Sequence, residues 1–354
     1  MQTTTILVTG GAGFIGCNFV KYLSSRYPDY RIVNLDALTY AGNLENLIDM
    51  EKKETYEFIK GDITQSDLID AIFQKGIDAV VHFAAESHVD RSITESDIFV
   101  KTNILGTQVL LEAAKKYGLR KFLHVSTDEV YGTLGPHGLF RETTPLAPNS
   151  PYSASKAGAD FLVRAYHQTY NLPINITRCS NNYGPYQFPE KLIPLMIIQA
   201  LNDRPLPVYG DGLNIRDWLH VEDHCRAIDL VLHHGESGKV YNVGGNNERT
   251  NIEVVETILK YLGKQESLVQ FVEDRPGHDH RYAIDASRIS KELGWNPRYT
   301  FEAGIKETID WYIANKSWWS RILSGEYRNY FLRHYSKRFG LRSIKSKDRE
   351  NESG

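Results

Sequence analysis

TILVTGGAGFIGCNFVKYLSSRYPDYRIVNLD, residues 5–36, is the stretch that decides the fold of this chain. An apolar, β-rich run at Thr5–Thr9 leads into a turn that contains Gly10, Gly13 and Gly16, and Phe19–Ser25 then shows the apolar spacing of a helix. A second strand, Arg31–Leu35, follows. This order predicts a βαβ unit whose glycines bring backbone N–H groups close to a pyrophosphate at the helix N-terminus.

The acid that follows the second strand indicates which dinucleotide this unit binds. Asp36 lies where a carboxylate can accept both hydroxyls of a ribose, and a 2′-phosphate would meet its negative charge. Ala37 supplies no arginine to offset that charge. The sequence therefore favours NAD over NADP.

The alternation of strands and helices continues along the first half of the chain. Glu57–Lys60, Ala79–Phe83 and Lys121–Ser126 are predicted strands, and Thr102–Tyr117 is a predicted helix. Repeated strand–helix units imply an α/β fold, a Rossmann-like doubly wound parallel sheet. Ligands of such sheets bind beyond the carboxyl ends of the strands, so three strand ends should share one rim. These are Asp62-Ile63, Phe83-Ala84-Ala85-Glu86-Ser87 and Ser126-Thr127-Asp128-Glu129. Asp62 either caps the next helix or bonds the adenine.

Composition excludes several classes of partner. With 41% hydrophobic and 24% charged residues and a net charge of -3, the chain has the balance of a globular protein without a basic field for nucleic acid. No apolar run approaches the roughly 20 residues of a membrane span, and no signal peptide is expected, which favours a cytoplasmic location. Cys17, Cys179 and Cys225 are far apart in sequence, so we expect buried thiols rather than a disulfide framework or a zinc site. No metal is predicted, and the adjacent His233 and His234 are expected to be solvated.

The second half of the chain differs from the first in its amino-acid composition. Proline and tyrosine become frequent after about residue 180, which predicts a smaller C-terminal α/β lobe for substrate. We divide the chain into a cofactor domain at residues 1–180, a substrate lobe at 181–320 and a basic tail at 321–354. Val240–Val243 is expected to return to the first sheet. The tail is expected to be a solvated helix or a frayed end.

One pair of residues suits the movement of a hydride. Tyr152 and Lys156 are one helical turn apart, so both side chains point the same way. Lowering a tyrosine pKa by roughly three units takes about 4 kcal/mol, which a nearby ammonium and a nicotinamide cation supply together. Pro151 marks a fixed entry into this helix.

Two adjacent acids suit the removal of water. Asp128 and Glu129 follow an apolar strand at the predicted rim. Two carboxylates placed together raise the pKa of at least one of them, so one acts as an acid and the other as a base. Thr127 is placed to hand a proton between a sugar hydroxyl and Tyr152.

Several long segments resemble the dTDP-glucose 4,6-dehydratases, a family of extended short-chain dehydrogenases/reductases. They include residues 9–16, 84–92, 126–132, 152–156 and 180–185, and the resemblance covers roughly residues 5–315. It implies that Tyr152, with Lys156 and Thr127, deprotonates the C4 hydroxyl as NAD takes the hydride. Glu129 then removes the C5 proton while Asp128 protonates the departing C6 hydroxyl. The hydride returns to C6, which gives a 4-keto-6-deoxy sugar.

The resemblance also assigns the binding residues. For NAD it implies Gly10, Gly13, Phe14, Ile15, Gly16, Asp36, Ala37, Leu38, Thr39, Asp62, Ile63, Phe83, Ala84, Ala85, Ser87, Thr102, Tyr152, Lys156 and Asn182. For the nucleotide sugar it implies Ser87, Thr127, Asn181, Lys191, Leu192, Pro207, Tyr209, Arg216, Asn251, Asp274 and His278. Arg216 either takes a phosphate or pairs with Asp217 or Asp211, and Tyr209 either stacks on a pyrimidine or packs. The resemblance implies a homodimer through the helices around Thr102–Tyr117 and Pro151–Tyr170.

Other functions use the same cofactor elements. A nucleotide-sugar 4-epimerase or a UDP-glucuronate decarboxylase would keep the glycine turn and the Tyr152/Lys156 pair but would not need Asp128 and Glu129. A non-catalytic NAD-binding protein would need none of these four side chains. The base of the nucleotide stays open between thymine and uracil, because one methyl group changes binding by only about 1 to 3 kcal/mol.

Overall fold

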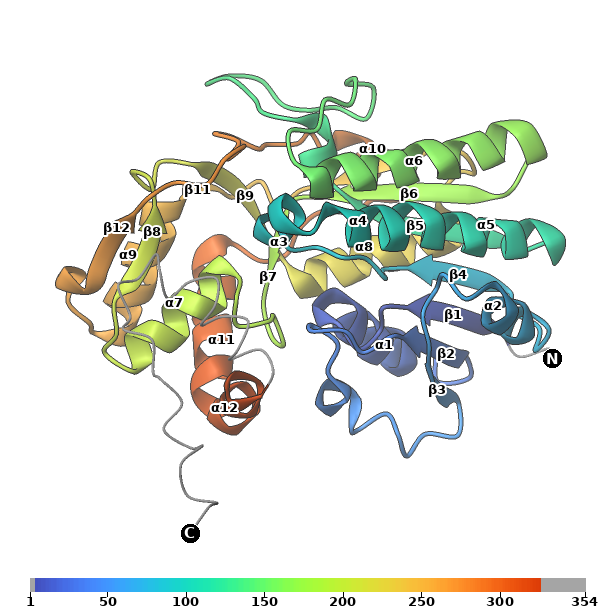
Figure 1. Ribbon diagram of the computed structural model, residues 1–354, viewed down its shortest axis with the longest axis horizontal. Coiled ribbons are helices and arrows are strands. Elements are labelled where there is room, and N and C mark those ends of the chain that lie inside the picture. Colours follow the sequence, from blue (N-terminus) through green and yellow to red (C-terminus); the bar gives the residue numbers. More distant parts are fainter. Residues whose placement is uncertain (1–3, 326–354) are drawn as a thin grey trace, which may run out of the picture.

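The computed structural model describes residues 4–325 and consists of two packed lobes (Figure 1). The larger lobe contains a seven-stranded sheet in the order β10-β6-β5-β4-β1-β2-β3, in which every neighbouring pair is parallel. This confirms the predicted Rossmann-like doubly wound fold. The strands are β1 (Thr5–Thr9), β2 (Arg31–Asp36), β3 (Tyr56–Lys60), β4 (Ala79–His82), β5 (Lys121–Thr127), β6 (Ile174–Cys179) and β10 (Val240–Val243).

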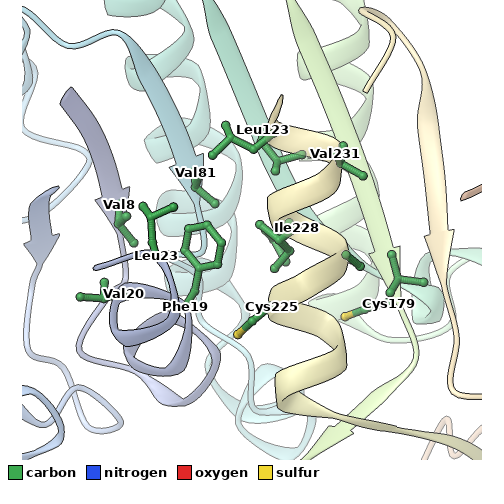
Figure 2. Close-up of a cluster of buried hydrophobic side chains, with 14 of the residues drawn as sticks. Val8, Phe19, Val20, Leu23, Val81, Leu123, Cys179, Cys225, Ile228 and Val231 are labelled. Carbon is green, nitrogen blue, oxygen red and sulfur yellow. The ribbon is translucent and has the colours of Figure 1, made fainter. Parts of the chain in front are cut away.

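Helices cover both faces of this sheet because the inner strands are apolar on both sides. One face packs against α1 (Phe14–Arg26), α8 (Val221–His234) and α10 (Ser287–Leu293), with Phe19, Ile228 and Val231 fully buried among the strand residues (Figure 2). The other face packs against α2 (Ser66–Phe73), α5 (Thr107–Lys116) and α6 (Pro151–Tyr170). The cysteines Cys17, Cys179 and Cys225 are buried as free thiols.

Two predicted helix boundaries were wrong. Helix α1 begins at Phe14 rather than Phe19, because its first turn directly follows the glycine turn, where Phe14 and Ile15 line a cavity at the strand ends and also pack against the edge of the core. The predicted helix at Thr102–Tyr117 begins earlier than expected, because α4 (Ser96–Phe99) continues into a π-helix at Val100–Gly106 and then into α5. A further short helix, α3 (Val89–Thr94), precedes them. A Cβ on Gly106 would lie 2.4 Å from Ile63 Cδ1, so the backbone approaches closely where the π-helix ends.

The smaller lobe has its own apolar core, which includes Tyr183, Trp218 and Phe301. It contains a three-stranded sheet, a pair of parallel strands and helices that pack against them (Figure 1). These elements are β7 (Asn181–Tyr183), β9 (Ile215–His220) and β11 (Glu248–Thr250), then β8 (Leu206–Tyr209) and β12 (Val269–Val272), with α7 (Leu192–Leu201), α9 (Asn251–Leu262), α11 (Phe301–Ala314) and α12 (Lys316–Ser324).

The chain crosses between the lobes several times. After β9 it returns to the large sheet through α8 and β10, where Val240 pairs with Ile176. Helix α12 packs back onto the large lobe, and Trp318 Nε1 donates to Asn46 Oδ1 at 2.8 Å. Most of the predicted basic tail lies outside the described residues. None of the described helices is long and apolar enough to span a membrane.

Candidate active site

A cavity of about 320 Å³ lies beyond the carboxyl ends of the strands of the large sheet. Most predicted cofactor and catalytic residues line it. Those that do are Gly10, Gly13, Phe14, Ile15, Gly16, Asp36, Ala37, Thr39, Asp62, Ile63, Phe83, Ala84, Ala85, Ser87, Thr102, Thr127, Asp128, Glu129, Tyr152, Lys156, Asn181, Asn182 and Lys191. Leu38 is not among them, although its backbone N–H binds Asp36.

Two positions of the glycine turn, Gly10 and Gly16, have no space for a side chain. Gly10 has φ +73°, and a Cβ there would lie 2.6 Å from the backbone nitrogen of Ala84. A Cβ on Gly16 would lie 2.2 Å from the Gly10 carbonyl oxygen. Helix α1 starts directly after Gly13, and no side chain caps its N-terminus. The first turn of α1 thus offers backbone N–H groups and the positive end of a helix dipole to an anion.

Asp36 organises the turn as well as facing the cavity. Its Oδ2 accepts the backbone N–H of Ala12 at 2.9 Å, and its Oδ1 accepts that of Leu38 at 2.8 Å. Burial raises the Asp36 pKa, and the two backbone bonds oppose that shift. A carboxylate has lone pairs beyond these two bonds, so Asp36 can still accept ribose hydroxyls. Asp62 Oδ1 accepts the N–H and the hydroxyl of Thr64 ahead of α2, whose N-cap is Gln65, so Asp62 does not cap that helix. Asp62 lines the cavity, and a bond to the adenine stays a prediction.

Helix α6 presents Tyr152 and Lys156 to this cavity. Its N-terminus is fixed by a capping box between Ser150 and Ser153, with Pro151 in the first turn. Lys156 Nζ donates to the Val125 carbonyl at 2.9 Å, and burial lowers its pKa to about 8. The Tyr152 pKa is raised well above its usual value, first by burial and then by the charge of Glu129. The predicted lowering of the Tyr152 pKa by the Lys156 ammonium and a nicotinamide cation together stays a prediction.

The two acids follow β5 in a short 3-10 helix, Asp128–Tyr131. Thr127 caps it, because its hydroxyl accepts the Glu129 N–H at 3.3 Å. The Thr127 hydroxyl also lies 3.4 Å from Asp128 Oδ1. Asp128 is 1% exposed, and burial followed by the charge of Glu129 raises its pKa well above the usual value. Burial raises the Glu129 pKa too, but there cations oppose the shift. The arrangement thus separates a protonated acid from a more readily ionised one.

Those cations are Lys191, Arg216 and Arg275, all from the segments that form the smaller lobe. Lys191 Nζ donates to the Ser87 carbonyl at 3.0 Å. The Arg216 guanidinium is buried over the ring of Tyr282 and donates to the backbone carbonyl of Asp279 at 2.9 Å. Asp217 instead accepts the N–H groups of Gly245 and Asn247, so no ion pair with Asp217 accounts for Arg216. Three cations beside the acid pair suit an anionic ligand such as a diphosphate.

The remaining predicted nucleotide residues lie outside the cavity lining. Leu192 begins α7, Pro207 is buried in β8, and Asn251 begins α9. Tyr209 packs edge-on against His278, and its hydroxyl donates to Asp90 Oδ2 at 3.0 Å. His278 Nδ1 lies 2.7 Å from Asp274 Oδ1.

Several residues of the site were not named from the sequence. Tyr40, Gln187, Phe188 and Glu190 line the cavity. Glu190 is buried, which raises its pKa to about 7, and lies 3.4 Å from His88 Nε2. The signal that could have found it was its place in the Pro189-Glu190-Lys191 segment.

Other histidines lie away from this cavity. His233 is not solvated as expected, because it lies against Tyr27 and binds Asp229 at 2.9 Å. Within residues 4–325, no cluster of His, Cys, Asp and Glu is placed to hold a metal ion.

Comparisons with known proteins agree with this geometry. A family model described as GDP-mannose 4,6 dehydratase matches residues 7–308. A dTDP-glucose 4,6-dehydratase of Xanthomonas campestris pv. campestris is 58% identical over 343 residues, which cover 92% of this chain and 97% of that one. The crystal structure of a dTDP-glucose 4,6-dehydratase from Bacillus anthracis in complex with NAD has a TM-score of 0.86 at 54% identity, covering 90% of this chain and 100% of that chain. A UDP-glucose 4-epimerase from Thermotoga maritima has a TM-score of 0.83 at 30% identity, covering 88% and 100%.

Proposed function

The chain belongs to the GDP-mannose 4,6 dehydratase family, and we propose that within this family it is an NAD-dependent dTDP-glucose 4,6-dehydratase, a hydro-lyase. The observation that carries the proposal is the position of Asp128 and Glu129 on the same cavity as Tyr152 and Lys156. A 4-epimerase moves a hydride at C4 alone, so it has no use for a buried acid and base in addition to the Tyr/Lys pair.

The cofactor end fits NAD. Gly10 and Gly16 leave no space for a Cβ, and Asp36 faces the cavity with a carboxylate that favours ribose hydroxyls over a 2′-phosphate. When bound, NAD supplies the acceptor for the C4 hydride and its reduced form returns that hydride to C6.

Tyr152 has the place of the base for the C4 hydroxyl. Burial raises the pKa of the Tyr152 phenol, so this pKa must fall before Tyr152 can act as a base at neutral pH. A hydrogen bond with Thr127 acts in that direction. Lys156 is held by the Val125 carbonyl beneath the cavity floor, where its ammonium stabilises a nearby phenolate.

The acid pair divides the elimination between two roles. Asp128 is the more strongly protonated group, which suits the donor to the departing C6 hydroxyl. The charges of Arg275, Arg216 and Lys191 all oppose the effect of burial on the Glu129 pKa, which suits Glu129 as the base for the C5 proton. The C4 ketone acidifies that C5 proton, so elimination depends on prior oxidation. Asp128 is buried and Glu129 is half-buried, which limits the access of water while the unsaturated intermediate exists.

The nucleotide end supports a diphosphate but does not choose the base. Lys191, Arg216 and Arg275 supply charge, and Ser87, Thr127 and Asn181 line the cavity and are proposed to contact the sugar. Leu192, Pro207, Tyr209, Asn251, Asp274 and His278 are proposed to hold the rest of the nucleotide. The preference for dTDP over UDP rests on the relatives, which are dTDP-glucose dehydratases.

Incubation with dTDP-glucose in D2O, followed by NMR of the sugar, tests the function. The expected product is a 4-keto-6-deoxy sugar with one solvent deuteron at C5 and no net reduced cofactor. A parallel incubation with UDP-glucose measures the preference for the base. A C4 epimer without deuterium would show that the chain is an epimerase instead.

We also propose that the chain forms a homodimer through α5, α6 and the π-helix. Large apolar side chains are exposed on this surface, with Val100 at 54%, Leu105 at 47% and Phe161 at 58%. Such side chains on neighbouring helices mark an interface between subunits. Analytical ultracentrifugation should give twice the monomer mass, and Phe161→Glu should lower it. A cytoplasmic location is likewise proposed from the family resemblance.

A further inference from the structure

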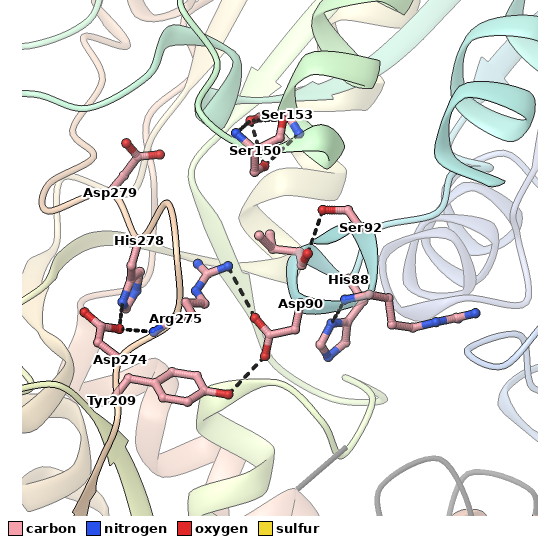
Figure 3. Close-up of polar contacts among 12 residues, drawn as sticks. His88, Asp90, Ser92, Ser150, Ser153, Tyr209, Asp274, Arg275, His278 and Asp279 are labelled. Carbon is pink, nitrogen blue, oxygen red and sulfur yellow. Dashed lines mark hydrogen bonds and ion pairs between the residues drawn. The ribbon is translucent and has the colours of Figure 1, made fainter. Parts of the chain in front are cut away.

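Asp90 connects the two lobes at the mouth of the site. It lies in the first turn of α3, three residues after Ser87, which lines the cavity. Asp90 Oδ2 accepts the hydroxyl of Tyr209 at 3.0 Å, and Asp90 Oδ1 lies 3.5 Å from Arg275 Nη1 (Figure 3). Tyr209 ends β8, and Arg275 lies in the segment after β12. A single carboxylate thus holds two side chains of the smaller lobe.

Hydrogen bonds within the large lobe fix the segment that carries Asp90. His88 caps α3, because its Nδ1 accepts the Arg91 N–H at 3.3 Å, and the Ser92 hydroxyl donates to the Val89 carbonyl at 2.6 Å (Figure 3). Asn103 also binds both the N–H and the carbonyl of Glu86, at 2.8 and 3.0 Å. The loop that carries Asp90 is therefore fixed to the cofactor lobe before it reaches the smaller lobe.

Arg275 is the partner that gives this contact a functional consequence. The side chains of Asp90 and Arg275 are each 12% exposed, so the pair is shielded from most solvent. Arg275 is the first of the three cations that oppose the effect of burial on Glu129. Whatever fixes the guanidinium of Arg275 also fixes positive charge beside the acid pair.

We propose that Asp90 is a positioning residue of the nucleotide-sugar site, where its carboxylate holds Tyr209 and Arg275 in place against the cofactor lobe for the nucleoside diphosphate. The inference rests on the proposed function. Because these side chains are held before the ligand arrives, less conformational freedom is lost on binding. Without Asp90, the ligand itself would have to order Tyr209 and Arg275.

Calorimetric titration of the NAD-loaded protein with dTDP tests this role. Asp90→Ala should weaken dTDP binding about tenfold, whereas Asp90→Asn should weaken it less because an amide oxygen still accepts the Tyr209 hydroxyl. The KM for dTDP-glucose should rise by a similar factor with kcat within about twofold. Glu95→Gln is the matched control, because Glu95 carries the same charge at the end of α3 but pairs with Arg91. It should leave dTDP binding unchanged.

A double-mutant cycle with Arg275→Ala separates positioning from general damage to the fold. If Asp90 acts through Arg275, the Asp90→Ala change should cost much less in the Arg275→Ala background than in the wild type. Fully additive effects would overturn the proposal. Tighter dTDP binding by Asp90→Ala would overturn it too, because Asp90 would then be competing with the diphosphate for Arg275. Wild-type protein that fails to bind dTDP would instead refute the proposed substrate.

Discussion

The cofactor end and the nucleotide end of this site are built in different ways. At the cofactor end, the turn from Gly10 to Gly16 and the ends of parallel strands supply backbone groups that one cavity gathers together. At the nucleotide end, Tyr209, Arg216 and Arg275 come from separate segments. The Asp90 carboxylate holds Tyr209 and Arg275, and the Asp279 backbone carbonyl holds Arg216. The first end depends on backbone geometry that tolerates no side chain. The second depends on a set of side chains, so single substitutions there should weaken ligand binding by smaller amounts.

The most severe test of this contrast is Gly16→Ala. Its Cβ would lie 2.2 Å from the Gly10 carbonyl oxygen, so the turn must move away from the position that holds a pyrophosphate. NAD affinity should fall at least about 100-fold, measured by fluorescence titration. Gly135→Ala is the control, because a Cβ there meets nothing within 4 Å. Equal NAD binding by both variants would show that the backbone of the turn is not decisive.

At the nucleotide end, Arg216→Ala should have a smaller but specific effect. Loss of a buried guanidinium should weaken dTDP binding about 50-fold while NAD affinity stays the same. Arg249→Ala is a close control, because Arg249 lies opposite Arg216 in the β9–β11 pair but contacts Phe301 and the exposed Glu302. Parallel losses of NAD and dTDP binding would contradict the separation of the two ends.

The buried ammonium of Lys156 should lower the free energy of unfolding of the protein. Its folded pKa of about 8 is below the usual 10.5, so the buried ammonium destabilises the fold at neutral pH. This penalty is complete below the folded pKa and is relieved as pH rises toward the unfolded pKa. Relative to Lys156→Met, the wild type should therefore gain about 2 kcal/mol of unfolding free energy between about pH 7 and about pH 9.5.

Chemical denaturation at both pH values measures that difference. Lys306→Met, at an exposed position on α11, should show no such change with pH. A pH-independent difference between Lys156→Met and the wild type would mean that Lys156 is not held at a cost in the folded protein.

The cofactor end of the site could be predicted from the sequence more completely than the nucleotide end. The glycine turn, Asp36 and the Tyr152/Lys156 pair are local patterns, and the rule that strand ends share a rim places Asp128 and Glu129 with them. Arg275 and Glu190 come from segments without a regular period, so no hydrophobic pattern shows which way their side chains face, and only the neighbouring Lys191 pointed to Glu190. The start of α1 at Phe14 was missed because Phe14 and Ile15 directly follow the glycine turn and are shared between the cavity and the edge of the core.

The pKa of Tyr152 shows a further limit of local reasoning. The four-residue spacing placed Lys156 beside it, but the spacing does not reveal how deeply the phenol is buried or that Glu129 lies close enough to oppose its ionisation. Both effects depend on the packing of β5 against α6 and on the shape of the cavity between the lobes.

The central claim is that oxidation and elimination belong to separate side chains in one cavity. Single-turnover mixing of the NAD-loaded protein with dTDP-glucose tests it, with the absorbance of reduced cofactor as the readout. Glu129→Gln should accumulate reduced cofactor while product formation falls about 100-fold or more, and Tyr152→Phe should form almost none. Product formation at the wild-type rate by Glu129→Gln would contradict the assignment of Glu129 as the base.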